Sequence, residues 1–404
     1  MERRWKMDHN QMELECFTFS TLDTRFLMDL LKGLYNMMVK MKALILFLAF
    51  ISTKALPTLE NRAQHRTLAT KLSSQSVVES VNLDATSTFK TFLYPQFADA
   101  SLTDIKGLMG VKEDHDVVVA KELGRSIKLG PKYDDESFKN PITLPTEFDS
   151  ATQWPQCQDL INEIRDQSWC GSCWAVSSSS VLTDRLCIAS NGTIKTEISA
   201  ADLLECCDYC GSGCVGGYPY RAFHYVEQLG VVSGGNYTSH QGCNPYPFPP
   251  CHAPDSKNYP ECKKRNFPTP KCQQKCQNGY SEHDYKHDKY YASLSYSYVR
   301  DSFGVMKEIV QRGPIVFAAL EVYEDFLYYK SGVYQHKTGG YLGLHAVKVV
   351  GWGVENGTNY WKVANSWGPQ WGENGFFKIR RGYNEANIEG SVNAVVVVAK
   401  SPSP

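Results

Sequence analysis

The sequence predicts an α+β protein in which helix signals come before strand signals. A run of small and aliphatic residues without proline or glycine predicts a helix over 173–188. Alternating apolar residues after His345, and again at 360–363, predict strands in the last part of the chain. Thirteen of the 14 cysteines lie between Cys157 and Cys276. This density is typical of a protein that folds in an oxidising compartment.

The composition excludes several classes of function. The chain has 404 residues, enough for two or three domains. Lys and Arg number 42 and Asp and Glu number 43, so the formal net charge is −1. Such a balance provides no basic field for nucleic acid or an anionic membrane surface. A hydrophobic content of 42% is that of a globular protein.

A short apolar segment predicts a secretory signal peptide over residues 41–55. Nine apolar residues, 43–51, follow two lysines and precede a short stretch with small residues. A bilayer span needs about 20 apolar residues, so this run is too short to be an anchor. The alternative is a buried helix. Because a signal peptide normally begins a chain, we expect translation to start near Met41, or at Met37 or Met38, and residues 1–40 to be a mis-assigned extension.

Residues 56–143 are predicted to form a separate segment in front of the mature domain. The segment is polar, contains no cysteine and has helical patterning near 89–92 and 102–106. Asn-Pro and Leu-Pro pairs then interrupt the chain, and the composition changes to cysteine, glycine and aromatic residues. We therefore place a domain boundary near residue 143 and expect 144–404 to be the mature domain.

Cys173 is the candidate nucleophile. It begins the expected helix, where the backbone dipole favours a thiolate over a thiol. The thiolate is the form of cysteine that attacks a carbonyl carbon. The alternative is that Cys173 forms a disulfide. Because the block holds an odd number of cysteines, one thiol must remain unpaired.

Residues 170–174, Cys-Gly-Ser-Cys-Trp, resemble the signature of the papain family of cysteine proteases. The resemblance extends over essentially all of 144–395. It implies a papain-like two-domain fold with a helical left domain and a β-barrel right domain. It also implies that Cys173 is the nucleophile, and that the side chain of Gln167 and the backbone N–H of Cys173 form an oxyanion hole.

A cysteine nucleophile needs a base, and the base needs an acceptor that orients it. His345 and Asn365 lie at two predicted strands, which could place them side by side. The Asn365 carbonyl would then accept from one imidazole nitrogen while the other nitrogen faces the thiolate. A lone histidine on a strand is usually a packed core residue, but the order Cys173, His345, Asn365 is that of the family. The resemblance further implies that Trp367 shields the His345–Asn365 bond from water.

An insertion distinguishes this chain from the general family pattern. His345 lies 172 residues after Cys173, whereas the general pattern has ~130–150. The cysteine- and proline-rich stretch 243–276 resembles the occluding loop of cathepsin B-like members. Those members carry two adjacent histidines in the loop, but this chain has only His252 there. We therefore expect endopeptidase activity to dominate, with weak removal of C-terminal dipeptides.

The other twelve cysteines of the block are an even number, enough for six disulfides. The sequence alone does not choose their pairing. A zinc site at Cys206, Cys207, Cys210 and Cys214 is the alternative, although we expect neither a metal nor a cofactor. Similarity to cathepsin B-like enzymes implies the pairs Cys157–Cys187, Cys170–Cys214, Cys206–Cys272, Cys207–Cys210, Cys243–Cys276 and Cys251–Cys262.

The resemblance also implies where a substrate binds. An extended peptide is expected in the cleft between the two domains, with its main chain on Gly216 and Gly217, because glycine permits close approach. The alternative is that the two glycines only form a turn. The other expected contacts are Gln167 and Trp367 on the leaving-group side, and Ala319 and Ser391 in the pocket for the side chain two residues before the cut.

Ser391 is expected to set the preference of that pocket. Cathepsin B-like relatives carry an acidic residue where we align Ser391. Loss of that charge should weaken acceptance of arginine and favour apolar side chains. Glu389 is close in sequence, so a small shift of the alignment would restore an acidic residue.

The predicted function is therefore a cysteine endopeptidase, made as a zymogen, in lysosomes or outside the cell. Expected partners are protein and peptide substrates, the chain's own propeptide as inhibitor, and cystatin-like inhibitors. We expect no nucleic acid and no membrane span. Two other classes compete: a catalytically inactive binding protein on the same fold, and a growth-factor-like cysteine module. Glycosylation sequons lie at Asn191, Asn236 and Asn356.

Overall fold

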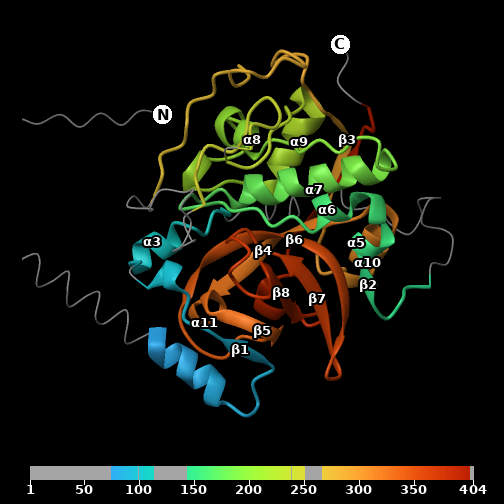
Figure 1. Cartoon of the computed structure of the whole chain (residues 1–404). Coiled ribbons are helices and arrows are strands. Elements are labelled where there is room, and N and C mark those ends of the chain that lie inside the picture. Colours follow the sequence, from blue (N-terminus) through green and yellow to red (C-terminus); the bar gives the residue numbers. More distant parts are fainter. Residues whose placement is uncertain (1–73, 99, 113–142, 238, 251–265, 401–404) are drawn as a thin grey trace, which may run out of the picture. The chain divides into compact units, whose positions relative to one another are not determined.

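The described residues all lie within Thr67–Pro404. The predicted signal peptide, residues 1–40 and His252 lie outside them. No helix in the described part of the chain is both long and apolar enough to cross a bilayer. The computed structural model describes residues 74–98, 100–112, 143–237, 239–250 and 266–400 (Figure 1).

Helices gather on one side of the strands, in what we call the helical lobe (Figure 1). Its longest helix, α7, occupies the position predicted for 173–188. The helices of this lobe are α6 (Gln158–Ile161), α7 (Cys173–Ala189), α8 (Ala200–Cys206) and α9 (Pro219–Leu229). Three helices outside this lobe are α5 (Ser150–Gln153), α10 (Ser302–Arg312) and α11 (Glu324–Leu327). Turns of 3₁₀ helix lie at Pro155–Cys157, Gly213–Val215 and Glu385–Asn387.

Helix α7 is buried on all sides over its first four turns, from Cys173 to Cys187. A helix in such surroundings must satisfy its polar side chains internally. Its serines do so by donating to the preceding turn: Ser177 Oγ bonds to Cys173 O at 2.7 Å and Ser178 Oγ to Trp174 O at 2.7 Å. The packing on every side fixes the N-terminus of the helix, and with it Cys173.

In the described part of the chain, nine strands form one sheet. The sheet curls round its own core, and we call this part the sheet lobe (Figure 1). The order is β1-β5-β8-β7-β6-β4-β9-β3, and β2 pairs with β6. All pairs are antiparallel except β5 with β8. The strands are β1 (Phe89–Thr91), β2 (Phe148–Asp149), β3 (Ala292–Tyr298), β4 (Ile315–Tyr323), β5 (Tyr329–Tyr334), β6 (Tyr341–Glu355), β7 (Thr358–Ala364), β8 (Phe376–Arg380) and β9 (Val392–Val397).

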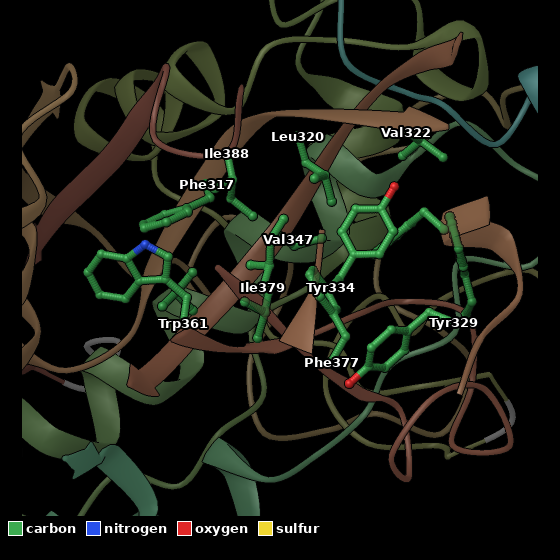
Figure 2. Packing of buried hydrophobic residues seen from close by; sticks show 14 of the residues in the cluster. Phe317, Leu320, Val322, Tyr329, Tyr334, Val347, Trp361, Phe377, Ile379 and Ile388 are labelled. Carbon is green, nitrogen blue, oxygen red and sulfur yellow. The ribbon is translucent and has the colours of Figure 1, made fainter. Parts of the chain in front are cut away.

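The curled sheet encloses a core of aromatic and branched side chains (Figure 2). Phe317 from β4 meets Trp361 from β7 edge to face, with ring centroids 5.3 Å apart. Tyr334 and Phe377 lie in the same cluster, and each packs against Phe326. Aromatic pairs in this geometry stabilise a core beyond simple burial. The core makes β6 and β7 a rigid support for the residues that they carry.

Buried ion pairs connect α7 to the sheet lobe. Arg185 on α7 bonds to Glu308 on α10 at 2.8 Å, and both side chains are almost completely buried. Lys348 on β6 reaches Asp184 on α7 at 2.9 Å. Removing one partner of such a pair leaves an uncompensated buried charge, which is strongly destabilising. These ion pairs therefore fix the position of α7 relative to the sheet lobe.

Residues 74–112 pack against the sheet lobe as an additional layer (Figure 1). The helical pattern near 89–92 is a wrong prediction, because residues 89–91 form strand β1, which pairs with β5. A partner strand more than 200 residues away supplies the hydrogen bonds, so the local pattern did not decide the outcome. Residues 102–106 are helical as predicted: α3 (Leu102–Lys106) begins at a capping box made by Ser101 and Asp104.

The disulfides occupy the cysteine-rich part of the helical lobe. Every cysteine of the alternative zinc site is bridged, so none of them is a thiolate ligand for a metal. The sixth expected pair, Cys251–Cys262, lies outside the described residues. The five pairs in the described chain are Cys157–Cys187, Cys170–Cys214, Cys206–Cys272, Cys207–Cys210 and Cys243–Cys276.

Candidate active site

Cys173 is the one free cysteine among the described residues. It is the first residue of α7, preceded by Ser172 as the N-cap. Its neighbour in the motif, Cys170, is bridged to Cys214. The thiol lies against the other lobe, because the backbone amide of Ala346 on β6 hydrogen-bonds to it. A free thiol at a helix N-terminus, beside the residue that follows His345, is the central feature of the site.

His345 lies in the middle of β6, and Asn365 directly follows β7, the antiparallel neighbour of β6. The pairing brings His345 Nε2 to 2.8 Å from Asn365 Oδ1. The Ser366 backbone N–H donates to the same oxygen at 2.8 Å, which fixes the orientation of the amide. Since a carbonyl oxygen only accepts, Nε2 carries the imidazole proton. The other nitrogen, Nδ1, is buried and has no hydrogen-bond partner in the described structure.

The indole of Trp367 covers the histidine–asparagine pair. Its ring centroid lies 5.0 Å from that of His345, at an interplanar angle of 32°. Trp367 is itself buried, and Phe97 of the N-terminal segment packs against it edge to face at 5.9 Å. The bond between His345 and Asn365 is therefore screened from water, in surroundings where a hydrogen bond is electrostatically stronger.

Gln167 is held by Ser366, which also flanks the catalytic candidate Asn365. The Gln167 backbone N–H donates to Ser366 O at 2.9 Å, and Gln167 Oε1 accepts from Ser366 Oγ at 2.7 Å. The other end of the amide, Nε2, donates to Leu108 O at 3.0 Å and to Cys170 O at 2.8 Å. The sequence analysis did not identify Ser366, whose position beside Asn365 was its only signal.

The N-terminal segment passes through the site between the two lobes. Gly110 O accepts from the Gly217 N–H at 2.9 Å, and the Lys112 N–H donates to Gly217 O at 3.1 Å. On the other side, the Val111 N–H donates to Leu344 O at 3.2 Å. The main chain of the segment is thus bonded to both walls at the level of the nucleophile. The sequence analysis did not identify this crossing.

Of the two glycines expected to bind a peptide main chain, only Gly217 bonds to the crossing segment. Gly216 has a φ of +104° and bonds instead within its own turn, to Gly213 and Ser212. A side chain on Gly217 would collide with the ring of Trp174 at 2.6 Å. The glycine at this position is therefore required both by the packing behind it and by the chain that approaches it.

Burial controls the ionisation of both reactive groups in this covered state. Loss of water raises the pKa of the Cys173 thiol to about 11, although the backbone amides of Ala346 and Gly110 act in the opposite direction. Burial likewise lowers the pKa of His345 to about 4, and its bond to Asn365 opposes this shift. Between these pH values the site holds a neutral thiol and a neutral imidazole.

Of the two expected pocket residues, Ala319 lies on β4 and Ser391 directly precedes β9, the neighbour of β4 in the sheet. Ala319 on β4 is buried, and the Ala318 N–H before it donates to Ser391 O at 2.9 Å. Glu389 is buried as well, but its carboxylate accepts from Trp361 Nε1 at 2.9 Å and from the Gly382 N–H at 2.7 Å. These bonds commit Glu389 to a turn of the chain, which argues against it as the acidic residue of the pocket.

Comparison with known proteins gives the family. Residues 144–396 match the model of the papain family cysteine proteases. A cathepsin B-like cysteine proteinase of Schistosoma japonicum is 43% identical over 297 residues, covering 74% of this chain and 83% of the relative. Cathepsin B-like cysteine proteinase 6 of Caenorhabditis elegans is 48% identical over 287 residues, covering 71% of this chain and 73% of the relative.

Solved structures agree with the sequence relatives. Procathepsin B S9 of Trypanosoma congolense superposes with a TM-score of 0.67 at 38% identity, covering 80% of this chain and 98% of that one. A digestive procathepsin L2 proteinase of Tenebrio molitor shares the fold, with a TM-score of 0.59 at 21% identity, covering 88% of this chain and 99% of that one. Both are proenzymes. The chain therefore belongs to the papain family of cysteine proteases and is a cathepsin B-like member of it.

Proposed function

We propose that the mature enzyme is an endopeptidase that works through an acyl-enzyme intermediate. Cys173 Sγ attacks the peptide carbonyl, and Gln167 Nε2 with the Cys173 N–H stabilises the oxyanion. His345 then gives the proton on Nδ1, which it has received from Cys173, to the leaving amine. The peptide bond breaks and a thioester remains on Cys173. A water molecule, deprotonated by His345, hydrolyses that thioester and restores the thiolate.

One observation carries this proposal: the free thiol of Cys173 is bonded by the backbone amide of Ala346, the residue after His345, and His345 Nδ1 has no partner in the described structure. Asn365 holds the His345 proton on Nε2, so Nδ1 is the nitrogen available to a proton from Cys173. The rival reading, an inactive binding protein on the same fold, predicts that one of these groups is missing. Cys173, His345, Asn365 and Gln167 are all present.

We further propose that residues 56–143 are a propeptide that inhibits the enzyme in cis. The described part that crosses the site, Gly110 to Lys112, would block substrate sterically and exclude water, which leaves Cys173 and His345 neutral. Release of the segment would let the proton pass from Cys173 to His345 Nδ1. The transfer moves a proton within the pair and leaves the number of protons bound by the two residues unchanged. We therefore expect removal of the propeptide, and not a change of pH acting on the pair itself, to produce the nucleophilic thiolate. The cut near residue 143 remains a prediction.

Alkylation of Cys173 by iodoacetamide at pH 5.5 tests this proposal. The covered thiol is protonated below about pH 11, so the full-length chain should react at least about 100-fold more slowly than the activated enzyme. The alkylation rate of the full-length chain should rise with pH, because an ordinary buried thiol ionises as the pH increases. Equal rates at pH 5.5 in the two forms would contradict the proposed switch. A slow reaction in the activated form would contradict the ion pair.

We propose that the mature enzyme prefers an apolar side chain two residues before the cut, because Ser391 provides no charge for arginine. Ser391→Glu is expected to raise the preference for arginine over phenylalanine about tenfold, since a carboxylate and a guanidinium form a charge-assisted bond. The measurement is kcat/KM on two peptide amides that differ only at that residue. An unchanged ratio would place the pocket elsewhere. Ser293→Glu, on the exposed edge of β3, is the matched control.

We propose that removal of C-terminal dipeptides is weak, because the insertion carries His252 alone. Matched peptides with a free and an amidated C-terminus should be cut at similar rates by the activated enzyme. A dipeptidyl carboxypeptidase needs the free carboxylate and would strongly prefer the first peptide. Such a preference would show that a carboxylate-binding group exists in the insertion despite the missing second histidine.

We propose that the protein is made in the secretory pathway and works in lysosomes or outside the cell. Five disulfides and three sequons fit that route. Asn356 is exposed at the β6–β7 turn, and Asn191 is exposed beyond α7. Asn236 is half-buried, and its amide donates to Glu163 at 2.7 Å, so it is the sequon least suited to a glycan.

A further inference from the structure

Gln167, the candidate residue of the oxyanion hole, is also held by a residue that lies outside the papain-family motif. Its backbone carbonyl accepts from the hydroxyl of Tyr246 at 2.9 Å. The same hydroxyl lies 2.6 Å from Ser172 Oγ, the N-cap residue directly before the nucleophile. Tyr246 is buried and lies three residues after Cys243, at the beginning of the 243–276 insertion. One hydroxyl therefore connects the insertion to both ends of segment 167–172.

The protons in this contact can be assigned from chemistry. The Gln167 carbonyl only accepts, so the single hydroxyl proton of Tyr246 goes to it. The Ser172 hydroxyl must then donate to the Tyr246 oxygen. Burial raises the pKa of Tyr246 well above its ordinary value, so the hydroxyl stays protonated and keeps donating. Its loss would leave the buried Gln167 carbonyl without this donor and Ser172 with only Cys170 O, at 3.5 Å.

Three aromatic residues near the two ends of the insertion, Tyr246, Phe248 and Phe267, support this contact, and we call them the stem of the insertion. Tyr246 meets Phe248 edge to face at 5.6 Å, and Phe248 stacks on Phe267 at 4.6 Å. The Phe267 N–H in turn donates to Trp169 O at 3.1 Å, inside segment 167–172. The two sides of the stem therefore hold the segment at three points. Opposite them, Ser366 holds Gln167 from the sheet lobe.

We propose that Tyr246 is a positioning residue, whose hydroxyl fixes segment 167–172 so that Gln167 Nε2 and the Cys173 N–H converge on the oxyanion. This inference rests on the proposed function. It adds that the stem of the insertion contributes to the chemical step and not only to access to the cleft. Preorganised donors matter most where charge develops in the transition state. Loosening them should therefore lower kcat more than it changes KM.

Tyr246→Phe in the activated enzyme tests the proposal, because it keeps the ring and removes only the hydroxyl. We expect kcat for a peptide amide to fall about tenfold, a smaller loss than the ~10²–10³ for removal of an oxyanion donor itself, with KM within twofold. Binding of a peptide aldehyde, whose thiohemiacetal oxygen occupies the oxyanion hole, should weaken by a similar factor. Alkylation of Cys173 by iodoacetamide forms no oxyanion and should keep its rate.

The controls separate positioning from stability. Tyr334→Phe removes another buried hydroxyl, which bonds to Asp325 in the sheet lobe, and should leave kcat unchanged. Ser172→Ala serves as the second variant if Tyr246→Phe does not fold, with an expected two- to fivefold loss in kcat. Wild-type kcat in Tyr246→Phe, or equal losses in hydrolysis and alkylation, would overturn the proposal. Absence of activity in the wild-type enzyme would instead refute the proposed function.

Discussion

Replacing Cys173 by serine is expected to lower peptide hydrolysis by the activated enzyme by at least about 10⁴-fold, because the proposed mechanism forms the acyl-enzyme on the Cys173 sulfur. The substitution exchanges one buried atom at the start of α7 and removes no disulfide, since Cys173 is free. Its effect on folding should be small. Steady-state hydrolysis of a peptide amide, with active enzyme counted by titration, measures the loss.

The serine variant also provides its own control. Its full-length form should bind the propeptide as the wild type does, because the main-chain bonds between Gly110 and Gly217 do not involve the thiol. Melting temperature and disulfide content should therefore match the wild-type zymogen. Retention of more than about 1% of wild-type activity would show that another nucleophile does the chemistry.

Replacing Gly110 by alanine in the full-length chain is expected to release the propeptide from the cleft. A Cβ at this position would lie 2.1 Å from the carbonyl oxygen of Gly171, which is backbone and cannot turn aside. The crossing segment would have to lift, and water would reach Cys173. We expect alkylation of the uncut chain at pH 7 to accelerate at least tenfold, as measured by mass spectrometry within the first minutes.

Leu83→Ala is the matched control for this prediction, because it lies in the same segment and its side chain is 83% exposed. It should leave the alkylation rate of the full-length chain unchanged. If the Gly110→Ala chain is alkylated as slowly as the wild type, the propeptide inhibits the enzyme without close contact at Gly171.

A short motif and the order of the residues that follow it supply the catalytic candidates, whose roles stay predictions. The Cys-Gly-Ser-Cys-Trp signature locates Cys173, and the order of His345 and Asn365 along the chain identifies the other two candidates. The helix at 173–188 was predictable because its pattern is local and uninterrupted. The observed α7 differs from that prediction only at its last residue.

Features that depend on distant parts of the chain were not predictable. Residues 89–91 became a strand because β5 offers them a free edge, which no local pattern reveals. The neutral state of Cys173 and His345 follows from a cover that only the folded chain provides. Alignment alone leaves Ser391 and Glu389 as alternatives for the pocket, and only the folded chain reveals that Glu389 is bonded to Trp361 and Gly382.

The most direct test of the central claim is to treat the activated enzyme with a thiol-directed peptidyl epoxide and map the modified residue by mass spectrometry. The account predicts one label per molecule, on Cys173, with hydrolysis lost in proportion to labelling and no label on the covered full-length chain. A label on another cysteine that abolishes activity, or full activity in enzyme labelled on Cys173, would contradict it.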